Sequence, residues 1–204
     1  MKEGNKAGIL LAAGTSSRMG SFKLLLPLGD EVVLERGIRL FRESGIEDVR
    51  VVVGYRAAEV IPFISKHKAR WVVNRFYPEG MFSSVQAGVA SLEKDIEAFF
   101  VLPADVPLVR VQTLLDLLEA YREGSCPIVF PRFGDRRGHP VLLSARLAPG
   151  LLNWNGEGGL RRFLDVCGFP SIDLEVTDED VLFDLDTPAD YEELRARFQR
   201  HGIP

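Results

Sequence analysis

The chain has 204 residues, of which 46% are hydrophobic and 26% charged. This composition excludes a disordered chain and supplies enough apolar residues for the core of one domain, which we expect to span residues 1–204. The formal net charge of -4 gives no overall attraction to nucleic acid or to an anionic membrane, so an anionic ligand would need a local cationic site.

The cysteines and the start of the chain favour a cytoplasmic protein. Cys126 and Cys167 show no CxxC spacing, which argues against a zinc site and against a disulfide framework. The apolar run at residues 8–14 is too short for a signal sequence or a membrane span. We therefore expect a cytoplasmic protein with neither a nucleic acid nor a membrane as its partner.

Short apolar runs alternate with helical periods in the first half of the chain. The apolar runs predict strands at residues 7–12, 49–53, 70–74 and 98–102. Apolar residues recurring three or four positions apart predict helices from Leu34 to Gly45, over 57–67, through Val85, Val89 and Leu92, and from Val111 to Tyr121. Pro62 should be tolerated only near the first turn of its helix.

The second half is less regular. Strands are expected at residues 127–131 and 140–144, on either side of a turn at 133–138, as an antiparallel excursion. A last helix should begin at Pro188, with Thr187 as its cap. Alternating strands and helices predict an α/β protein, a Rossmann-like three-layer sandwich with a mostly parallel sheet.

The segment LAAGTSSRMGSFK at residues 11–23 follows the first predicted strand. Its small residues let backbone N–H groups approach an anion, and Arg18 and Lys23 could neutralise a triphosphate and a pyrophosphate leaving group. The spacing matches neither a Walker A loop nor the GxGxxG fingerprint of dinucleotide-binding proteins. A flexible loop with two solvated cations is the alternative interpretation.

Two aspartates could hold a metal ion. Asp105 follows the predicted strand at 98–102, and Asp186 follows the apolar run at 181–183. Carboxylates at the ends of strands can share Mg²⁺, which takes its remaining ligands from water and phosphate oxygens. Alternatively, Asp105 shapes a turn between two prolines and Asp186 caps the last helix. Asp184, two residues earlier along the same presumed strand, could replace Asp186.

Five motifs together resemble the nucleotidyltransferases of the molybdenum-cofactor type, and most closely their cytidylyltransferase branch. In order they are LAAGTSSRMGSFKLLLPL at 11–28, GMFSSVQAG at 80–88, LPADVP at 102–107, GHP at 138–140 and DLDTPAD at 184–190. The resemblance implies the nucleotide-diphospho-sugar transferase type of fold and Mg²⁺-dependent transfer of CMP from CTP to a molybdopterin-type acceptor. GTP as the donor, a sugar phosphate as the acceptor and a non-catalytic cofactor carrier remain open alternatives.

The resemblance also implies roles for individual residues. Arg18, Lys23 and Asp105 would be catalytic, and Asp105 and Asp186 would bind Mg²⁺. The residues implied to bind the nucleotide are Leu11, Ala12, Ala13, Gly14, Lys23, Asn74, Ser83 and Gly88. Those implied to bind the acceptor are Gly138, His139 and Pro140.

Three further expectations concern the substrates and the partner. Alanine at position 13 is typical of the cytidylyl members of the family, where guanylyl members tend to have glycine. Arg132, Arg136 and Arg137 either attract the acceptor phosphate or form a solvated hairpin tip. A molybdenum hydroxylase apoenzyme would be the partner that receives the product.

Overall fold

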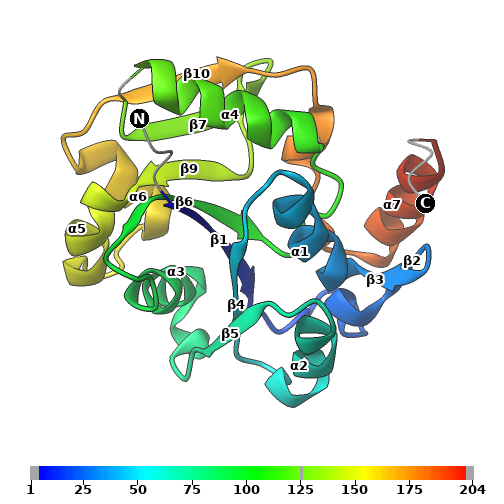
Figure 1. The fold of residues 1–204 in the computed structure, drawn as a ribbon. Coiled ribbons are helices and arrows are strands. Elements are labelled where there is room, and N and C mark those ends of the chain that lie inside the picture. The colour runs from blue at the N-terminus through cyan, green and yellow to red at the C-terminus, as the bar shows by residue number, and fades with distance from the viewer. Residues whose placement is uncertain (1–4, 125, 201–204) are drawn as a thin grey trace.

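A mixed sheet, most of whose strand pairs are parallel, runs through the computed structural model, which describes residues 5–124 and 126–200 (Figure 1). The strands are β1 (Asn5–Ala12), β2 (Pro27–Leu28), β3 (Glu31–Val32), β4 (Asp48–Val53), β5 (Arg70–Val73), β6 (Ile96–Pro103), β7 (Ile128–Phe133), β8 (Arg136–Arg137), β9 (Val141–Ser144) and β10 (Ser171–Glu175). The α-helices are α1 (Val33–Glu43), α2 (Ala57–Lys66), α3 (Met81–Ala90), α4 (Val111–Gly124), α5 (Ala148–Asn153), α6 (Gly159–Val166) and α7 (Pro188–Arg200). The 3₁₀ helices are η1 (Lys23–Leu25), η2 (Tyr77–Glu79), η3 (Ala145–Leu147) and η4 (Glu179–Leu182).

The strand order of the large sheet is β10-β7-β9-β6-β1-β4-β5, with β8 paired to β7. Strand β1 is parallel to both of its neighbours, β4 and β6, and β5 is parallel to β4. Strand β9 lies antiparallel between β6 and β7, and β10 is parallel to β7. The expected parallel sheet with a small antiparallel excursion is confirmed.

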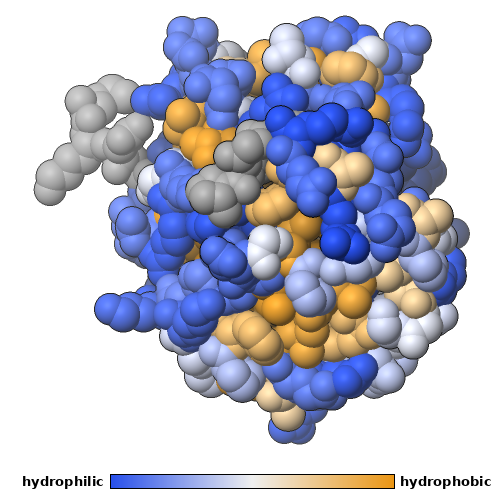
Figure 2. All heavy atoms as spheres, turned by 90° about the vertical axis from the view of Figure 1, so that its right-hand side faces the viewer, coloured by the Kyte–Doolittle hydropathy of each residue, from blue (hydrophilic) through white to orange (hydrophobic). Residues whose placement is uncertain are grey.

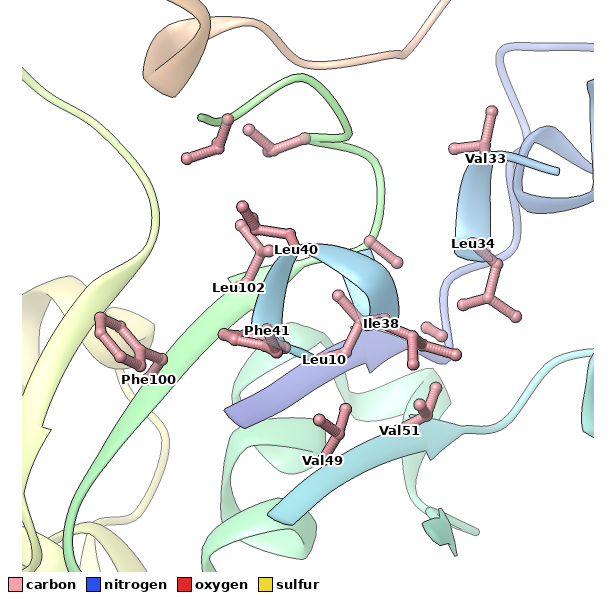
Figure 3. Packing of buried hydrophobic residues seen from close by; sticks show 14 of the residues in the cluster. Leu10, Val33, Leu34, Ile38, Leu40, Phe41, Val49, Val51, Phe100 and Leu102 are labelled. Carbon is pink, nitrogen blue, oxygen red and sulfur yellow. The ribbon is translucent and has the colours of Figure 1, made fainter. Parts of the chain in front are cut away.

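Helices pack closely on both faces of β1, because glycines at the contact points leave room for the side chains that face them. On one face, a Cβ at Gly37 of α1 would lie 2.6 Å from Leu10, and one at Gly8 would lie 2.7 Å from the ring of Phe41 (Figure 3). On the other face, a Cβ at Gly88 of α3 would lie 2.5 Å from Ile9. These contacts explain why β1 is apolar on both sides and give the three layers their spacing.

Several local expectations need correction. Pro62 lies inside α2, beyond its first turn, and the helix continues to Lys66. Leu92 lies beyond the end of α3. Residues 181–183 are not a strand, since η4 extends to Leu182. Residues 1–4, 125 and 201–204, which the expected domain includes, lie outside the described residues.

The second half also contains elements that we did not predict from the sequence. Helices α5 and α6 are only six and eight residues long, and a proline in one and glycines at the start of the other obscure their periodicity. Strand β10 reads Ser-Ile-Asp-Leu-Glu, an alternation typical of a half-exposed strand. The sequence therefore did contain a signal for β10.

Charged residues make up 26% of the chain, which favours a hydrophilic surface. On the face that carries α7 and α2, hydrophilic residues lie around a central band of apolar ones (Figure 2). In the described ranges, no helix has the length and apolar character that crossing a membrane requires.

Candidate active site

A cavity of about 500 Å³ opens at the carboxyl ends of β1 and β6, where open α/β sheets bind their ligands. The loop after β1 supplies much of its wall, with residues 11–18. The other lining residues are Lys23, Leu24, Tyr77, Pro78, Gly80, Met81, Ser84, Pro103, Asp105, His139, Asp184 and Asp186. The cavity thus collects residues from all five motifs.

The loop between β1 and η1 is anchored at several points. Met19 and Phe22 are buried in the core, and Phe22 packs edge-on against Tyr55. The Ser16 carbonyl accepts a hydrogen bond from Met19 N at 3.1 Å, and its hydroxyl accepts one from Lys23 N at 3.3 Å. The loop is therefore anchored at Ser16, Met19, Phe22 and Lys23, although Ser17, Arg18, Gly20 and Ser21 are exposed.

Four charged side chains meet at one end of the cavity. Lys23 Nζ lies 2.6 Å from Asp105 Oδ2 and 3.0 Å from Asp186 Oδ1. The guanidinium of Arg18 lies 2.9 Å from the second oxygen of Asp186. Lys23 is nearly buried, whereas the side chain of Arg18 is 70% exposed. The result is an alternating row of cations and carboxylates, which we call the charge cluster (Arg18, Lys23, Asp105 and Asp186).

Backbone hydrogen bonds bring the two carboxylates together. Leu185 N donates to the carbonyl of Asp105 at 2.8 Å, which joins the loop after β6 to the segment before α7. That segment is fixed in turn by Asp190, whose Oδ2 accepts hydrogen bonds from Asp186 N at 3.1 Å and Thr187 N at 2.7 Å.

The hydrogen bonds at the start of α7 show whether Asp186 caps this helix. The Thr187 hydroxyl accepts a hydrogen bond from Asp190 N at 3.3 Å, so Thr187 caps the helix as expected, and Asp190 makes the cap reciprocal. Asp186 is left to face Lys23 and Arg18. The alternative in which Asp186 caps this helix is wrong.

The surroundings shift the proton affinities of three groups. Burial alone would lower the pKa of Lys23, but the charges of Asp105 and Asp186 and hydrogen bonds to them more than offset it and raise that pKa. Burial, together with the charges of Asp105 and Asp186, raises the pKa of Asp184. Burial lowers the pKa of the His139 imidazole, against the opposing charge of Asp105, and thereby favours its neutral form.

The charge cluster fits a divalent cation. Oxygens of Asp105 and Asp186 both approach a single cationic atom, Lys23 Nζ, so the two carboxylates converge on one point. Among residues 5–124 and 126–200, no group of three or more His, Cys, Asp or Glu side chains could hold a metal ion. A hard cation at the charge cluster would therefore take oxygen ligands from two carboxylates and from a phosphate-bearing substrate.

Not every residue expected to bind the nucleotide lines the cavity. Leu11, Ala12, Ala13, Gly14 and Lys23 do. Asn74 is buried behind the wall, where its Nδ2 donates to the hydroxyls of Ser83 and Ser84 at 2.9 Å each. Gly88 faces Ile9 of β1. Asn74 and Ser83 thus support the wall, and Gly88 takes part in helix packing.

The expected acceptor residues divide in the same way. His139 lines the cavity, whereas Gly138 and Pro140 do not. Gly138 packs against the side chain and the carbonyl of Val181, and His139 N donates to that carbonyl at 2.9 Å. The GHP segment therefore holds η4, and with it the approach to Asp184 and Asp186.

Two of the three arginines of the β7–β8 hairpin form ion pairs with carboxylates of β10. Arg132 pairs with Glu175 at 2.7 Å. Arg137 pairs with Asp173 at 2.8 Å and lies over the ring of Phe130. Arg136 is close enough to Asp184 to oppose the rise in its pKa.

The wall around Tyr77 was missed in the sequence. A Cβ at Gly54, just after β4, would lie 2.8 Å from Tyr77 Cβ and 2.9 Å from the methyl group of Ala13. Tyr77 and Ala13 thus both pack on Gly54, and Pro78, Gly80 and Met81, which follow Tyr77, line the cavity. The Tyr-Pro pair and the following glycine are turn signals that mark the segment, but they do not reveal which loop it meets.

Comparison with known proteins agrees with this geometry. The model of the MobA-like NTP transferase domain matches residues 8–173. The molybdenum cofactor cytidylyltransferase of Escherichia coli K12 is 25% identical over 191 residues, 93% of this chain and 95% of that protein. The nicotine blue oxidoreductase of Paenarthrobacter nicotinovorans is 31% identical over 187 residues, 88% of this chain and 91% of that protein.

A solved structure has the same architecture. The crystal structure of Rv0371c from Mycobacterium tuberculosis superimposes with a TM-score of 0.83 at 27% identity, covering 95% of this chain and 98% of that one. The family match spans the loop after β1, the charge cluster up to Asp105 and the GHP segment. The chain therefore belongs to the MobA-like NTP transferase family and is a nucleotidyltransferase of that family.

Proposed function

We propose that this protein transfers CMP from CTP to the terminal phosphate of a molybdopterin-type acceptor and releases pyrophosphate. The observation that carries the proposal is the charge cluster, where Lys23 lies within 3.0 Å of both Asp105 and Asp186 and Arg18 lies beside Asp186. A cytidylyltransferase among the relatives supports the choice of substrates.

The residues of the cavity suit phosphoryl chemistry that depends on position and charge. An oxygen of the acceptor phosphate attacks the α-phosphorus of CTP, and the bond to the pyrophosphate oxygen breaks. Arg18 and Lys23, which line the cavity, would stabilise the negative charge that develops on the leaving group. No general base is required, because a phosphate monoester is already an anion near neutral pH.

Asp105 and Asp186 would hold Mg²⁺ in this proposal. When bound, the ion would reduce the repulsion between the nucleotide and the acceptor phosphate. His139 and Asp184 line the cavity close enough to Asp105 for its charge to act on both, and they would face the acceptor. A neutral imidazole suits such a contact, because it can donate or accept one hydrogen bond without adding charge.

The preference for CTP rests on the space beside Ala13. Ala13 lines the cavity, and its methyl group lies 2.9 Å from the position that a Cβ on Gly54 would occupy. This packing leaves little room for the loop to retreat from a bicyclic purine. A methyl-sized difference in a pocket is worth about 1–3 kcal/mol, so CTP should exceed GTP in kcat/KM by roughly 10–200-fold.

A competition assay tests the substrate assignment. The protein is incubated with Mg²⁺, purified molybdopterin and equal concentrations of CTP and GTP, and the dinucleotide product is identified by mass. We expect the cytosine dinucleotide to predominate and pyrophosphate to form in equal amount. Predominance of the guanine dinucleotide would reject the cytidylyl assignment, and a product formed only in a parallel incubation with a sugar phosphate in place of molybdopterin would reject the acceptor.

The relative named nicotine blue oxidoreductase makes redox activity a second candidate. Against it, β4 ends at Val53 and is followed by Gly54 and Tyr55, with no carboxylate to bind the ribose of a nicotinamide cofactor. The control is incubation with NADH or NADPH and a reducible dye. Rapid loss of the reduced cofactor, without nucleotide transfer, would favour this candidate.

A further inference from the structure

We propose that Lys23 is a built-in cation of the metal site, and that its displacement couples the binding of metal to the binding of nucleotide. This inference rests on the proposed function, because it assigns Asp105 and Asp186 to a divalent cation. It adds that these carboxylates already share a cation of the protein's own, and that a metal ion must compete with it.

Lys23 contacts both carboxylates at once. Its ammonium is 2.6 Å from one carboxylate and 3.0 Å from the other, so it stands where the two converge. Together with Arg18 it balances the two negative charges of the cluster. A divalent ion that binds to these oxygens must therefore break two charged hydrogen bonds, which weakens its binding to the nucleotide-free protein.

The ammonium of Lys23 can move although its backbone is held in place. The backbone of Lys23 is fixed, because its N–H donates to the Ser16 hydroxyl and the start of η1 is buried. Its flexible four-carbon chain can still move the ammonium from the carboxylates towards a triphosphate in the same cavity. Lys23 thus leaves the carboxylates at little cost only when an anion is present to receive it.

Coupling follows from these two properties of Lys23. The nucleotide supplies a new partner for Lys23 and phosphate oxygens for the metal, whereas the metal supplies a new partner for the two aspartates. Each ligand therefore removes a cost that the other would meet alone, and by linkage the effect is reciprocal. The charge cluster would then reach its catalytic arrangement only with both ligands bound.

Binding of Mn²⁺, measured by electron paramagnetic resonance and calorimetry, tests the inference without turnover. Titrations are made with the full chain alone and with the α,β-methylene analogue of CTP, after correction for Mn²⁺ bound by the free nucleotide. We expect the analogue to tighten Mn²⁺ binding to the wild-type protein by a factor in the usual range of about 5–150. Independent binding of the two ligands would overturn the proposal.

Variants of Lys23 identify the cause. Lys23→Met should tighten Mn²⁺ binding to the nucleotide-free protein several-fold and reduce the coupling to the part that comes from phosphate oxygens bound to the metal. Lys23→Arg should retain weak binding and coupling, because it keeps the charge. Lys23→Gln serves as a second neutral variant if Lys23→Met does not fold. Lys6→Met is the matched control, since Lys6 pairs with Glu97 on the sheet outside the cavity and should leave Mn²⁺ affinity unchanged.

Two outcomes separate this inference from the proposed function. If Mn²⁺ affinity is the same in wild type, Lys23→Met and Lys23→Gln while the analogue still recruits Mn²⁺, the displacement of Lys23 is rejected and the transferase proposal stands. If Mn²⁺ does not bind even with the analogue present, the metal site itself is rejected.

Discussion

Asp105 and Asp186 are held in place by backbone contacts that do not involve their carboxylates. The carbonyl of Asp105 accepts a hydrogen bond from Leu185 N, and Asp186 N donates to Asp190. Their charges can therefore be removed without releasing either loop. This separation of position from charge makes the two aspartates suitable for a direct test at the scale of single residues.

We predict that Asp105→Asn nearly abolishes nucleotide transfer and leaves the fold intact. An amide keeps the size of the side chain but loses the charge needed to bind a hard cation. Asp186→Asn should behave alike. Turnover with Mg²⁺, far-ultraviolet circular dichroism and the melting temperature are measured for each variant. If Asp184→Asn is the damaging change and Asp186→Asn is not, the metal ligand before α7 is Asp184.

A second prediction concerns the base. Ala13→Gly should reduce the ratio of kcat/KM for CTP to that for GTP towards 1 without reversing it, because the change opens space beside Gly54 and Tyr77. The measurement is steady-state kinetics with each nucleotide and the same acceptor. Ala104→Gly, at a buried position next to Asp105 that does not line the cavity, controls for a general effect on stability. An unchanged ratio would remove Ala13 from the determinants of specificity.

At the scale of elements, close packing of helices against β1 brings the loops of the site together. We predict that Gly88→Ala lowers the free energy of unfolding by about 1–3 kcal/mol, the usual cost of overpacking a core. Helix propensity alone would favour alanine by about 1 kcal/mol, so the sign shows which effect dominates. Here the added methyl would lie 2.5 Å from Ile9, which is fully buried in the sheet.

Kinetics of the same variant test the role that the resemblance implied for Gly88. If Gly88 serves packing alone, the folded Gly88→Ala protein should keep its KM for CTP while it unfolds at a lower urea concentration. Ala87→Gly, at the neighbouring and less buried position of α3, gives the effect of propensity with a smaller change in packing. A raised KM with unchanged stability would instead support direct contact with the nucleotide.

A buried carboxylate joins α1 to the end of α2. Glu35 Oε2 accepts a hydrogen bond from Val32 N at 2.9 Å, and Oε1 lies 2.8 Å from both Lys66 Nζ and His67 Nε2. Burial alone would raise the pKa of Glu35, but Lys66, the Val32 amide and His67 more than offset it and lower that pKa. A lowered folded-state pKa stabilises the protein above the ordinary value of 4.5, and this contribution is lost as the pH falls through the folded-state pKa.

Glu35→Gln should therefore destabilise the protein by roughly 1 kcal/mol at pH 7, and the difference from wild type should shrink below pH 4.5. Urea unfolding at pH 7 and at several values below 4.5 measures it. Glu97→Gln, which removes an exposed carboxylate paired with Lys6, should have little effect at either pH. A difference that stays constant with pH would show that the charge of Glu35 does not contribute.

Sequence patterns predicted the elements whose periodicity is long or whose apolar run is continuous. β1, β4, β6, α1 and α4 are of this kind, and so is the cap at Thr187. The patterns failed where contacts between distant segments decide the structure. Tyr77 and Ala13 both pack on Gly54, and Asp186 contacts Lys23 from a loop, not from the strand expected before it. Contacts between segments that are far apart in the sequence leave no periodic pattern in either segment.

At the scale of the whole molecule, the two halves of the chain share one sheet and one cavity. Strand β9 lies between β6 of the first half and β7 of the second, and β10 continues the sheet beyond β7. Helix α7 returns to the first half, beside β2 and β3 (Figure 1). There the Tyr191 hydroxyl donates to the Pro27 carbonyl at 2.6 Å. The cavity takes residues from Leu11 to Asp186. For these reasons we propose that residues 1–204 form a single domain.

Thermal unfolding tests that proposal together with the site. We predict one cooperative transition, which Mg²⁺ and the α,β-methylene analogue of CTP together shift upward as a whole. A ligand at 100 times its Kd stabilises by about 2.7 kcal/mol, which corresponds to roughly 5–10 °C for a protein of this size. Asp105→Asn should lose the part of the shift that depends on metal. Two transitions, of which ligand moves only one, would show that the halves unfold separately. A single transition that the two ligands leave unmoved would instead keep the domain and reject the site, because a ligand that binds the folded state must raise its melting temperature.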